Sequence, residues 1–140
     1  MAFRAESVQA RLRRLEEVVS ELRELGKLDR EALRASLRDM WAVERGLQLG
    51  AEILFDIGNH ILTAQYGVSP EDYEDILEQL ASQGILDTQL RQRLKGLAGF
   101  RNILVHDYLH LDQDRVLEGL ARAPKDFSDF AHAIRQWLEG

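Results

Sequence analysis

Cysteine is absent from this chain of 140 residues. Its absence excludes disulfides, a thiol nucleophile and thiolate metal sites. Long apolar runs are also missing, because no run approaches the roughly 20 residues that a membrane-spanning helix needs. The first residues, MAFRAESVQARLRR, are charged from Arg4 onward and contain no apolar signal core, so we expect no secretion. These absences predict a cytoplasmic protein with no membrane segment.

Proline is scarce, and the apolar/polar alternation of strands is missing. Apolar residues instead recur at steps of three and four, as at Val8, Leu12 and Leu15. We predict an all-α, up-down bundle of five or six helices in a single domain, residues 1–140. The expected helices are about 4–25; 29–66 with a break near 35; one from Ser69-Pro70 to Gly84; one from Asp87 or Thr88 through residues 100–110; a short one from Asp112; and one from Pro124.

Acidic residues are missing from 89–106, although the whole chain has a net charge of −6. That stretch contains four cations, Arg91, Arg93, Lys95 and Arg101. The net charge argues against a protein that coats nucleic acid by bulk attraction, whereas a positive island in an acidic chain is typical of a local anion site. A solvated basic helix face explains the same residues equally well.

The stretch FRNILVHDYLH, residues 100–110, gathers the side chains with the most useful chemistry. Arg101 has a permanent charge and a donor fork that fits phosphate. His106 can take or give a proton near neutral pH, and Asn102 can orient either group. On a straight helix, residues five positions apart lie about 140° apart around the axis. Either the helix ends near His106, or a second copy supplies the partner group across a two-fold axis.

Two weaker patterns accompany this stretch. His106 and His110 have the i, i+4 spacing of some metal sites, but no acid stands beside them at helical spacing, so we predict no metal. Mid-helix glycines suggest close approach of the second and fourth helices, at Gly46 with Gly50 and at Gly96 with Gly99. The polar residues that would then face Arg101 are Glu44, Gln48, Asp56 and His60. A solvated polar stripe is the alternative.

The segment GFRNILVHDY resembles the Arg-x4-His-x-Tyr signature of the HepT-like toxins of the HEPN superfamily. Flanking segments agree in order and spacing: AVERGLQLGAEILFDIGNHIL, then GVSPEDYEDILEQLASQGIL, then the signature, then DFSDFAHAI. The similarity covers about residues 35–135. It implies all-α homodimers whose ribonuclease site lies in a cleft at the dimer interface, where arginine and histidine from both subunits converge.

The resemblance also implies a role for each residue of the signature. His106 would act as general base or acid on the ribose 2′-hydroxyl and the leaving 5′-oxygen, with no metal and no cofactor. Arg101 would stabilise the charge that builds on the phosphate, and Asn102 would hold the polar network. Tyr108 would be the residue to which an MntA-like nucleotidyltransferase antitoxin attaches AMP, which silences the toxin.

The expected function is therefore that of an endoribonuclease toxin that acts on RNA. Two alternatives stay open. A non-catalytic HEPN-type subunit would dock on a nucleotidyltransferase and help present its substrate; such a subunit is expected to have lost the Arg-x4-His pattern, which is intact here. A structural helical dimer with a buried Arg–His network is the other alternative.

Overall fold

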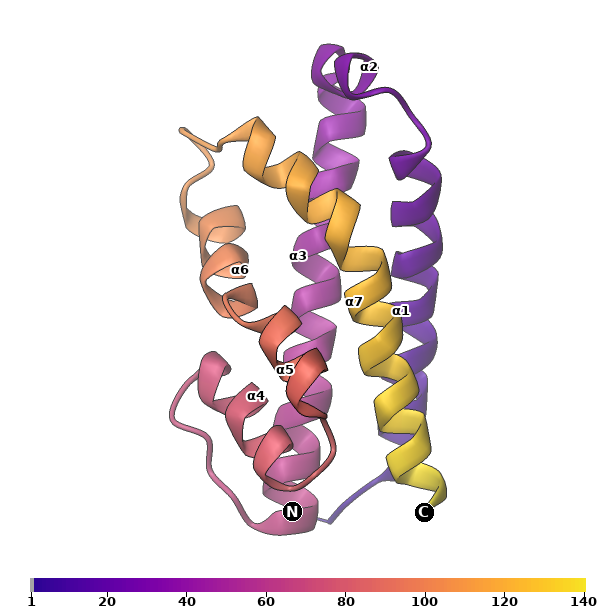
Figure 1. The fold of residues 1–140 in the computed structure, drawn as a ribbon, viewed down its shortest axis with the longest axis vertical. Coiled ribbons are helices and arrows are strands. Elements are labelled where there is room, and N and C mark those ends of the chain that lie inside the picture. The colour runs from indigo at the N-terminus through magenta and orange to yellow at the C-terminus, as the bar shows by residue number, and fades with distance from the viewer. Residues whose placement is uncertain (1) are drawn as a thin grey trace.

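The computed structural model describes residues 2–140, and within that range it contains helices and loops but no strands (Figure 1). Three long helices form the main bundle: α1 (Ala5–Gly26), α3 (Leu37–His60) and α7 (Gln113–Glu139). The shorter helices are α2 (Arg30–Ala35), α4 (Tyr73–Ser82), α5 (Thr88–Leu94) and α6 (Leu97–His106). The predicted all-α class is confirmed.

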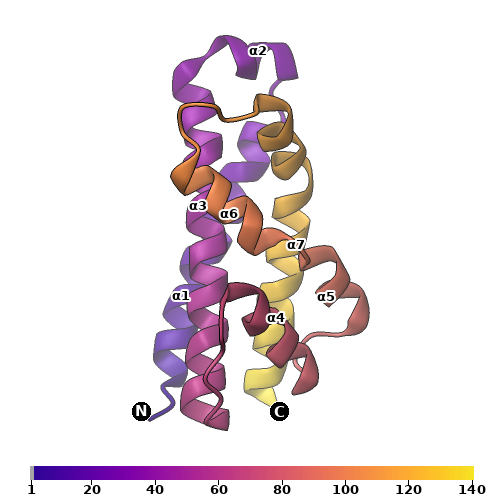
Figure 2. The same ribbon diagram turned by 90° about the vertical axis from the view of Figure 1, so that its left-hand side faces the viewer.

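The shorter helices lie in two places. Helix α2 covers one end of the bundle, while α4, α5 and α6 cover the side of α3 and α7 that is turned away from α1 (Figure 1). Figure 2 shows α6 crossing α3 obliquely, with α7 beside it. The stretch 100–110 therefore lies on the outside of the bundle, with α3 beneath it.

One apolar core runs along the long helices. On α1 the predicted stripe is buried, from Val8 and Leu12 to Leu22, because these residues recur on one helical face. On α7 the aromatic residues Phe127 and Phe130 are buried in the same core. Burying a large apolar side chain contributes about 1.5–3 kcal/mol, so this stripe pattern explains why the long helices pair.

Helix boundaries follow local capping chemistry. Ser36 begins α3 by accepting a hydrogen bond from the amide of Asp39 at 3.1 Å, which confirms the predicted break near residue 35. Asp87 caps α5, as predicted. The start of α4 differs from the prediction, because Asp72 and not Ser69 is its N-cap. After His60 the long helix continues as a π-helical segment, η1 (Ile61–Gln65).

Two predictions about the second half of the chain are wrong. Asp112 does cap a helix, but this helix runs on through Pro124, which is buried inside α7 and does not begin a new helix. The apolar stripe continues in register past the proline, and its burial outweighs the missing hydrogen bond. The predicted fourth helix is split into α5 and α6 at Gly96, whose φ of 87° lies in the left-handed region that suits glycine.

The predicted glycine contact is also wrong, although α3 and α6 do pack together. Gly46 faces Leu22 of α1, and Gly50 faces Phe127 of α7. The glycine that matters for α6 is Gly119 on α7, where an added Cβ would lie 2.8 Å from the ring of Phe100. The missing side chain at Gly119 therefore lets Phe100 anchor α6 against α7.

Candidate functional site

The signature lies at the end of α6. This helix ends at His106, and the next residue, Asp107, has φ −99° and ψ 33°, outside the helical region. The side chain of His106 is exposed, and Tyr108 in the following loop is 74% exposed. The helix does end near His106, but His106 is its last residue, so on this helix its side chain still lies about 140° around the axis from Arg101.

Arg101 is held by residues from two other helices and by its own neighbour. Its Nη2 donates to Oε1 of Glu52 on α3 at 3.2 Å, and its Nη1 donates to Oδ1 of Asn102 at 3.3 Å. The guanidinium carbon lies 5.3 Å from the ring centroid of Tyr73 on α4, within cation–π range. Gln48 donates to the same Glu52 oxygen at 3.2 Å. The guanidinium is thus fixed in position and direction.

The cluster around Arg101 is only partly buried. The Arg101 side chain is 19% exposed and that of Glu52 is 31% exposed. Tyr73 is 41% exposed and stacks against buried Phe55, with ring centroids 4.9 Å apart. Within residues 2–140 the buried Nε of Arg101 has no hydrogen-bond partner. An arginine has five N–H donors, so this guanidinium keeps donors for an incoming anion.

Sequence reasoning missed Glu52 and Tyr73. Glu52 lies one turn from Gln48 on α3, so the helical spacing that selected Gln48 also covers it. Tyr73 carried no such signal, because its approach to Arg101 depends on how α4 packs on α6. Of the polar residues expected near Arg101, only Gln48 joins the cluster, through Glu52.

The other polar residues on α3 have different surroundings. His60 accepts a hydrogen bond from the amide of Arg4 at 3.2 Å and stacks on Phe3, so it belongs to the far end of α3 and its expected place near Arg101 is wrong. Asp56 is exposed. Burial raises the pKa of Glu44 above its ordinary value.

The positive island is not a continuous track of free charge. Arg91 pairs with Glu74 at 3.1 Å and Glu78 at 3.3 Å, both on α4. Arg93 pairs with Asp126 and Asp129 on α7, each at 2.8 Å. The acids that neutralise these arginines are distant in sequence, which is why the acid-free stretch gave a misleading local charge.

The two acids that pair with Arg93 differ in their electrostatics. Burial raises the pKa of Asp126, and this effect exceeds the lowering by Arg93. Asp129 has a lowered pKa, first because Lys125 donates a hydrogen bond to it and then because Arg93 does. Both carboxylates lie 2.8 Å from Arg93, and these ion pairs hold α5 against α7.

Metal-binding clusters are absent from the part of the chain that the structure describes. Between residues 2 and 140, no group of three or more histidines and acids is arranged to hold a metal ion. No helix in the same range has the length and apolar character to cross a bilayer.

The model of the family described as ribonuclease HepT-like matches residues 15–134. The chain belongs to this family. The resemblance inferred from the signature is therefore confirmed. The residues around Arg101 and His106 all lie within the matched range.

Individual HepT proteins are similar to this chain in sequence and in structure. An mRNA nuclease HepT of Shewanella oneidensis is 35% identical over 89 residues, which are 64% of this chain and 67% of that protein. A tRNA nuclease HepT of Aphanizomenon flos-aquae is 26% identical over 132 residues, 94% of this chain and 89% of that one. The tri-AMPylated HEPN toxin of Shewanella oneidensis, solved in complex with its MNT antitoxin, superposes with a TM-score of 0.82 at 26% identity, covering 92% of this chain and 96% of that chain.

Proposed function

We propose that this HepT-like protein is a metal-independent endoribonuclease, in which Arg101 and His106 act on one phosphodiester of RNA. The observation that carries the proposal is the pre-positioned guanidinium. Arg101 is clamped by Glu52, Asn102 and Tyr73 while the histidine five positions later is exposed at the helix end. A fixed cation and an accessible acid–base group are the two elements that phosphodiester cleavage requires, and a second copy of the chain would bring them to one phosphate.

The proposed reaction needs only the substrate and these side chains. His106 takes the proton of the ribose 2′-hydroxyl, and the 2′-oxygen forms a bond to phosphorus. The bond from phosphorus to the 5′-oxygen breaks, and that oxygen takes up the proton that His106 had accepted, so the histidine returns to its starting state. The products are a 2′,3′-cyclic phosphate and a free 5′-hydroxyl. Arg101 donates to the non-bridging oxygens, where negative charge grows in the transition state.

A second copy of the chain is part of the proposal. Leu37 and Trp41 are 64% and 61% exposed, and their helical spacing places them on the face of α3 that carries Glu52. Large exposed apolar side chains are typical of a protein–protein interface. A homodimer through this face would bring two Arg101–Glu52 pairs toward a common two-fold axis.

The catalytic proposal is tested with purified protein, a structured RNA and excess chelator. The parent chain is expected to cleave the RNA, while Arg101→Ala and His106→Ala lose at least about a hundredfold in rate. A matched control is Arg13→Ala, which removes an exposed arginine from the distant helix α1. Equal absence of activity in all four proteins would favour a non-catalytic subunit that docks on a nucleotidyltransferase.

We also propose that a nucleotidyltransferase antitoxin silences this chain by attaching AMP to Tyr108. The 74% exposure of Tyr108 supports this, because its hydroxyl is open to an enzyme. The hydroxyl would attack the α-phosphate of ATP and release pyrophosphate. With partner and ATP present, intact mass should rise by one or more AMP units. Tyr108→Phe should prevent the rise, and a shift that survives this substitution would contradict the assignment.

The toxin role is tested in cells. Expression of the chain alone should arrest growth, and co-expression of the cognate nucleotidyltransferase should restore it. Cells that express His106→Ala should grow normally in both cases. Arrest by His106→Ala would show that toxicity arises from something other than RNA cleavage.

A further inference from the structure

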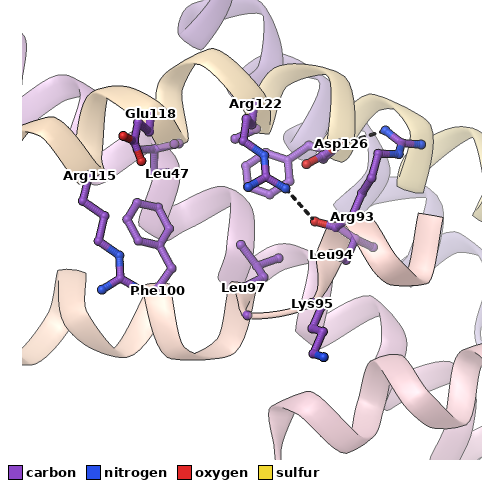
Figure 3. Close-up of a pocket in the computed structure, with 14 residues that line it drawn as sticks. Leu47, Arg93, Leu94, Lys95, Leu97, Phe100, Arg115, Glu118, Arg122 and Asp126 are labelled. Carbon is purple, nitrogen blue, oxygen red and sulfur yellow. Dashed lines mark hydrogen bonds and ion pairs between the residues drawn. The ribbon is translucent and has the colours of Figure 1, made fainter. Parts of the chain in front are cut away.

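A separate pocket opens on the other side of α6 from Arg101. It lies where the break between α5 and α6 faces α7, and it encloses about 230 Å³ (Figure 3). Successive helical residues point about 100° apart, so Phe100 lines this pocket while Arg101 reaches α3. The pocket is thus distinct from the signature cluster, but it borders the same short helix.

The walls of the pocket are apolar and include an aromatic ring. Phe100 and Leu97 of α6 lie opposite α7 (Figure 3), and Phe127 of the buried core is also part of the lining. Gly119 lets this ring pack closely on α7, because a Cβ there would lie 2.8 Å from the ring of Phe100. A flat group that stacks on an aromatic side chain, such as a nucleobase, suits such a wall.

The rim of the pocket is positively charged. Arg115 and Arg122 project from α7 over the pocket; Arg115 reaches toward Phe100 of α6, and Arg122 reaches toward the end of α5 (Figure 3). Among residues 2–140 neither makes an ion pair; Arg122 donates to the carbonyl of Arg93 at 3.3 Å, and Arg115 lies 5.9 Å from the ring centroid of Phe100. The seven-residue spacing puts both on one face of α7, about 10 Å apart along the axis.

The acids at the rim do not cancel this charge. Asp126 is committed to Arg93 at 2.8 Å, which leaves exposed Glu118 as the opposing carboxylate of the lining. The pocket also borders the start of α6, where the partial positive charge of a helix N-terminus adds to the field. An apolar slot between these two guanidinium groups therefore favours a ligand with a planar body and phosphate groups.

We infer that this pocket binds a nucleoside phosphate, with the base against Phe100 and phosphates on Arg115 and Arg122. Its volume of about 230 Å³ is below the roughly 300–1,000 Å³ of pockets that enclose a whole ligand, so the pocket would take the base and leave the phosphates at the rim. Within the proposed ribonuclease, on which this inference rests, that nucleotide is a unit of the RNA strand lying outside the scissile position. The pocket then helps to bind the RNA, while Arg101 and His106 cleave it at a different part of α6.

The test uses the full chain carrying His106→Ala, so that RNA stays intact, and a fluorescent single-stranded RNA of about ten nucleotides. Arg115→Gln with Arg122→Gln should weaken binding about tenfold. The slope of log affinity against log salt should fall by about 1.4, because each phosphate of a single strand that a cation neutralises contributes roughly 0.7. The matched control, Arg13→Gln with Arg23→Gln, removes two exposed arginines of α1 and should bind within twofold of the parent.

Two further measurements distinguish a loss of charge from a loss of folding, and RNA from free nucleotide. The double lysine variant, Arg115→Lys with Arg122→Lys, preserves the charges and should restore the salt slope, which separates an effect of charge from an effect on folding. Competition by excess AMP would identify free nucleotide as a second source of the same ligand, and failure of AMP to compete would identify RNA alone. If the double glutamine variant binds RNA with the same affinity as the control, the inference is wrong.

The two proposals fail in different ways. If the parent chain cleaves RNA but the glutamine variant binds and cleaves like the control, the pocket assignment alone is wrong. If the variant loses RNA binding while the parent cleaves nothing, the nuclease proposal alone is wrong.

Discussion

Oε1 of Glu52 accepts a hydrogen bond from Nη2 of Arg101 at 3.2 Å, across 49 positions of sequence. The same oxygen accepts from Gln48 at 3.2 Å. Because both side chains of the ion pair are partly buried, the pair is less screened than a fully exposed one, and it fixes the orientation of the guanidinium. The signature arginine of α6 is therefore held in place from α3.

Glu52 is predicted to position Arg101. Glu52→Ala should lower kcat for RNA cleavage about tenfold or more with a smaller change in KM, because a misplaced guanidinium no longer meets the transition state. Glu52→Gln keeps an acceptor oxygen and should lose less. Steady-state kinetics with thermal unfolding as a control measure this. Wild-type kcat in both variants would refute the positioning role.

Tyr73 is predicted to support the same arginine through its ring and not its hydroxyl. Tyr73→Phe keeps both the contact with Arg101 and the stack on Phe55, and should cleave RNA at nearly the parental rate. Tyr73→Leu removes the cation–π interaction, which is worth about 0.5–2 kcal/mol, and should cleave several-fold more slowly. A decrease in Tyr73→Phe as large as that in Tyr73→Leu would assign the role to the hydroxyl.

Glu44 is predicted to reduce stability at neutral pH. Burial raises its pKa in the folded chain, so the folded state binds this proton more tightly than the unfolded state. The free energy of unfolding therefore falls as pH rises through the window between the unfolded and folded pKa values, and the cost is complete above it. Glu44→Gln should raise the urea midpoint near pH 7 and give no gain below about pH 4, where the unfolded carboxyl is also protonated.

The control for this pH dependence is Asp56→Asn, which removes the same charge from an exposed position on α3. It should change the free energy of unfolding by less than about 0.5 kcal/mol at either pH. A Glu44→Gln gain that persists at low pH would show that the amide stabilises by packing and not by removal of a partly buried charge.

Two glycines, one on α7 and one on α6, are predicted to respond oppositely to alanine. At Gly119 a Cβ would lie 2.8 Å from Phe100 and 3.3 Å from Leu47, so Gly119→Ala should destabilise the fold by about 1–3 kcal/mol. At Gly99 the described residues leave open space within 4 Å, so Gly99→Ala should stabilise α6 by about 0.5–1 kcal/mol. Chemical denaturation measures both, and equal effects would contradict the packing of Phe100 on α7.

Much of the fold was readable because the information is local. Apolar stripes such as Val8 to Leu22 set the helical face, and side-chain caps at Asp87 and Asp112 set where helices begin. The prediction that Pro124 begins a new helix was wrong. Proline is usually excluded from helix interiors, but here the buried apolar stripe on both sides of it keeps α7 continuous.

The candidate site was only partly readable. Arg101 and His106 were found from their chemistry and spacing. Tyr73 was not, since its approach to Arg101 depends on tertiary packing of α4. The charge of Arg93 was misjudged for the same reason, because Asp126 is distant in sequence and close in space. Local sequence specifies which groups are available, and the packing of helices decides which of them meet.

Single-turnover cleavage of one RNA and its DNA counterpart in excess chelator, by the parent chain and by His106→Ala, tests the proposed nuclease most directly. We predict that only the parent cuts, that it cuts only RNA, and that the upstream product ends in a 2′,3′-cyclic phosphate. Cleavage of the DNA, disappearance of activity on chelation, or an unchanged rate in His106→Ala would contradict the proposal.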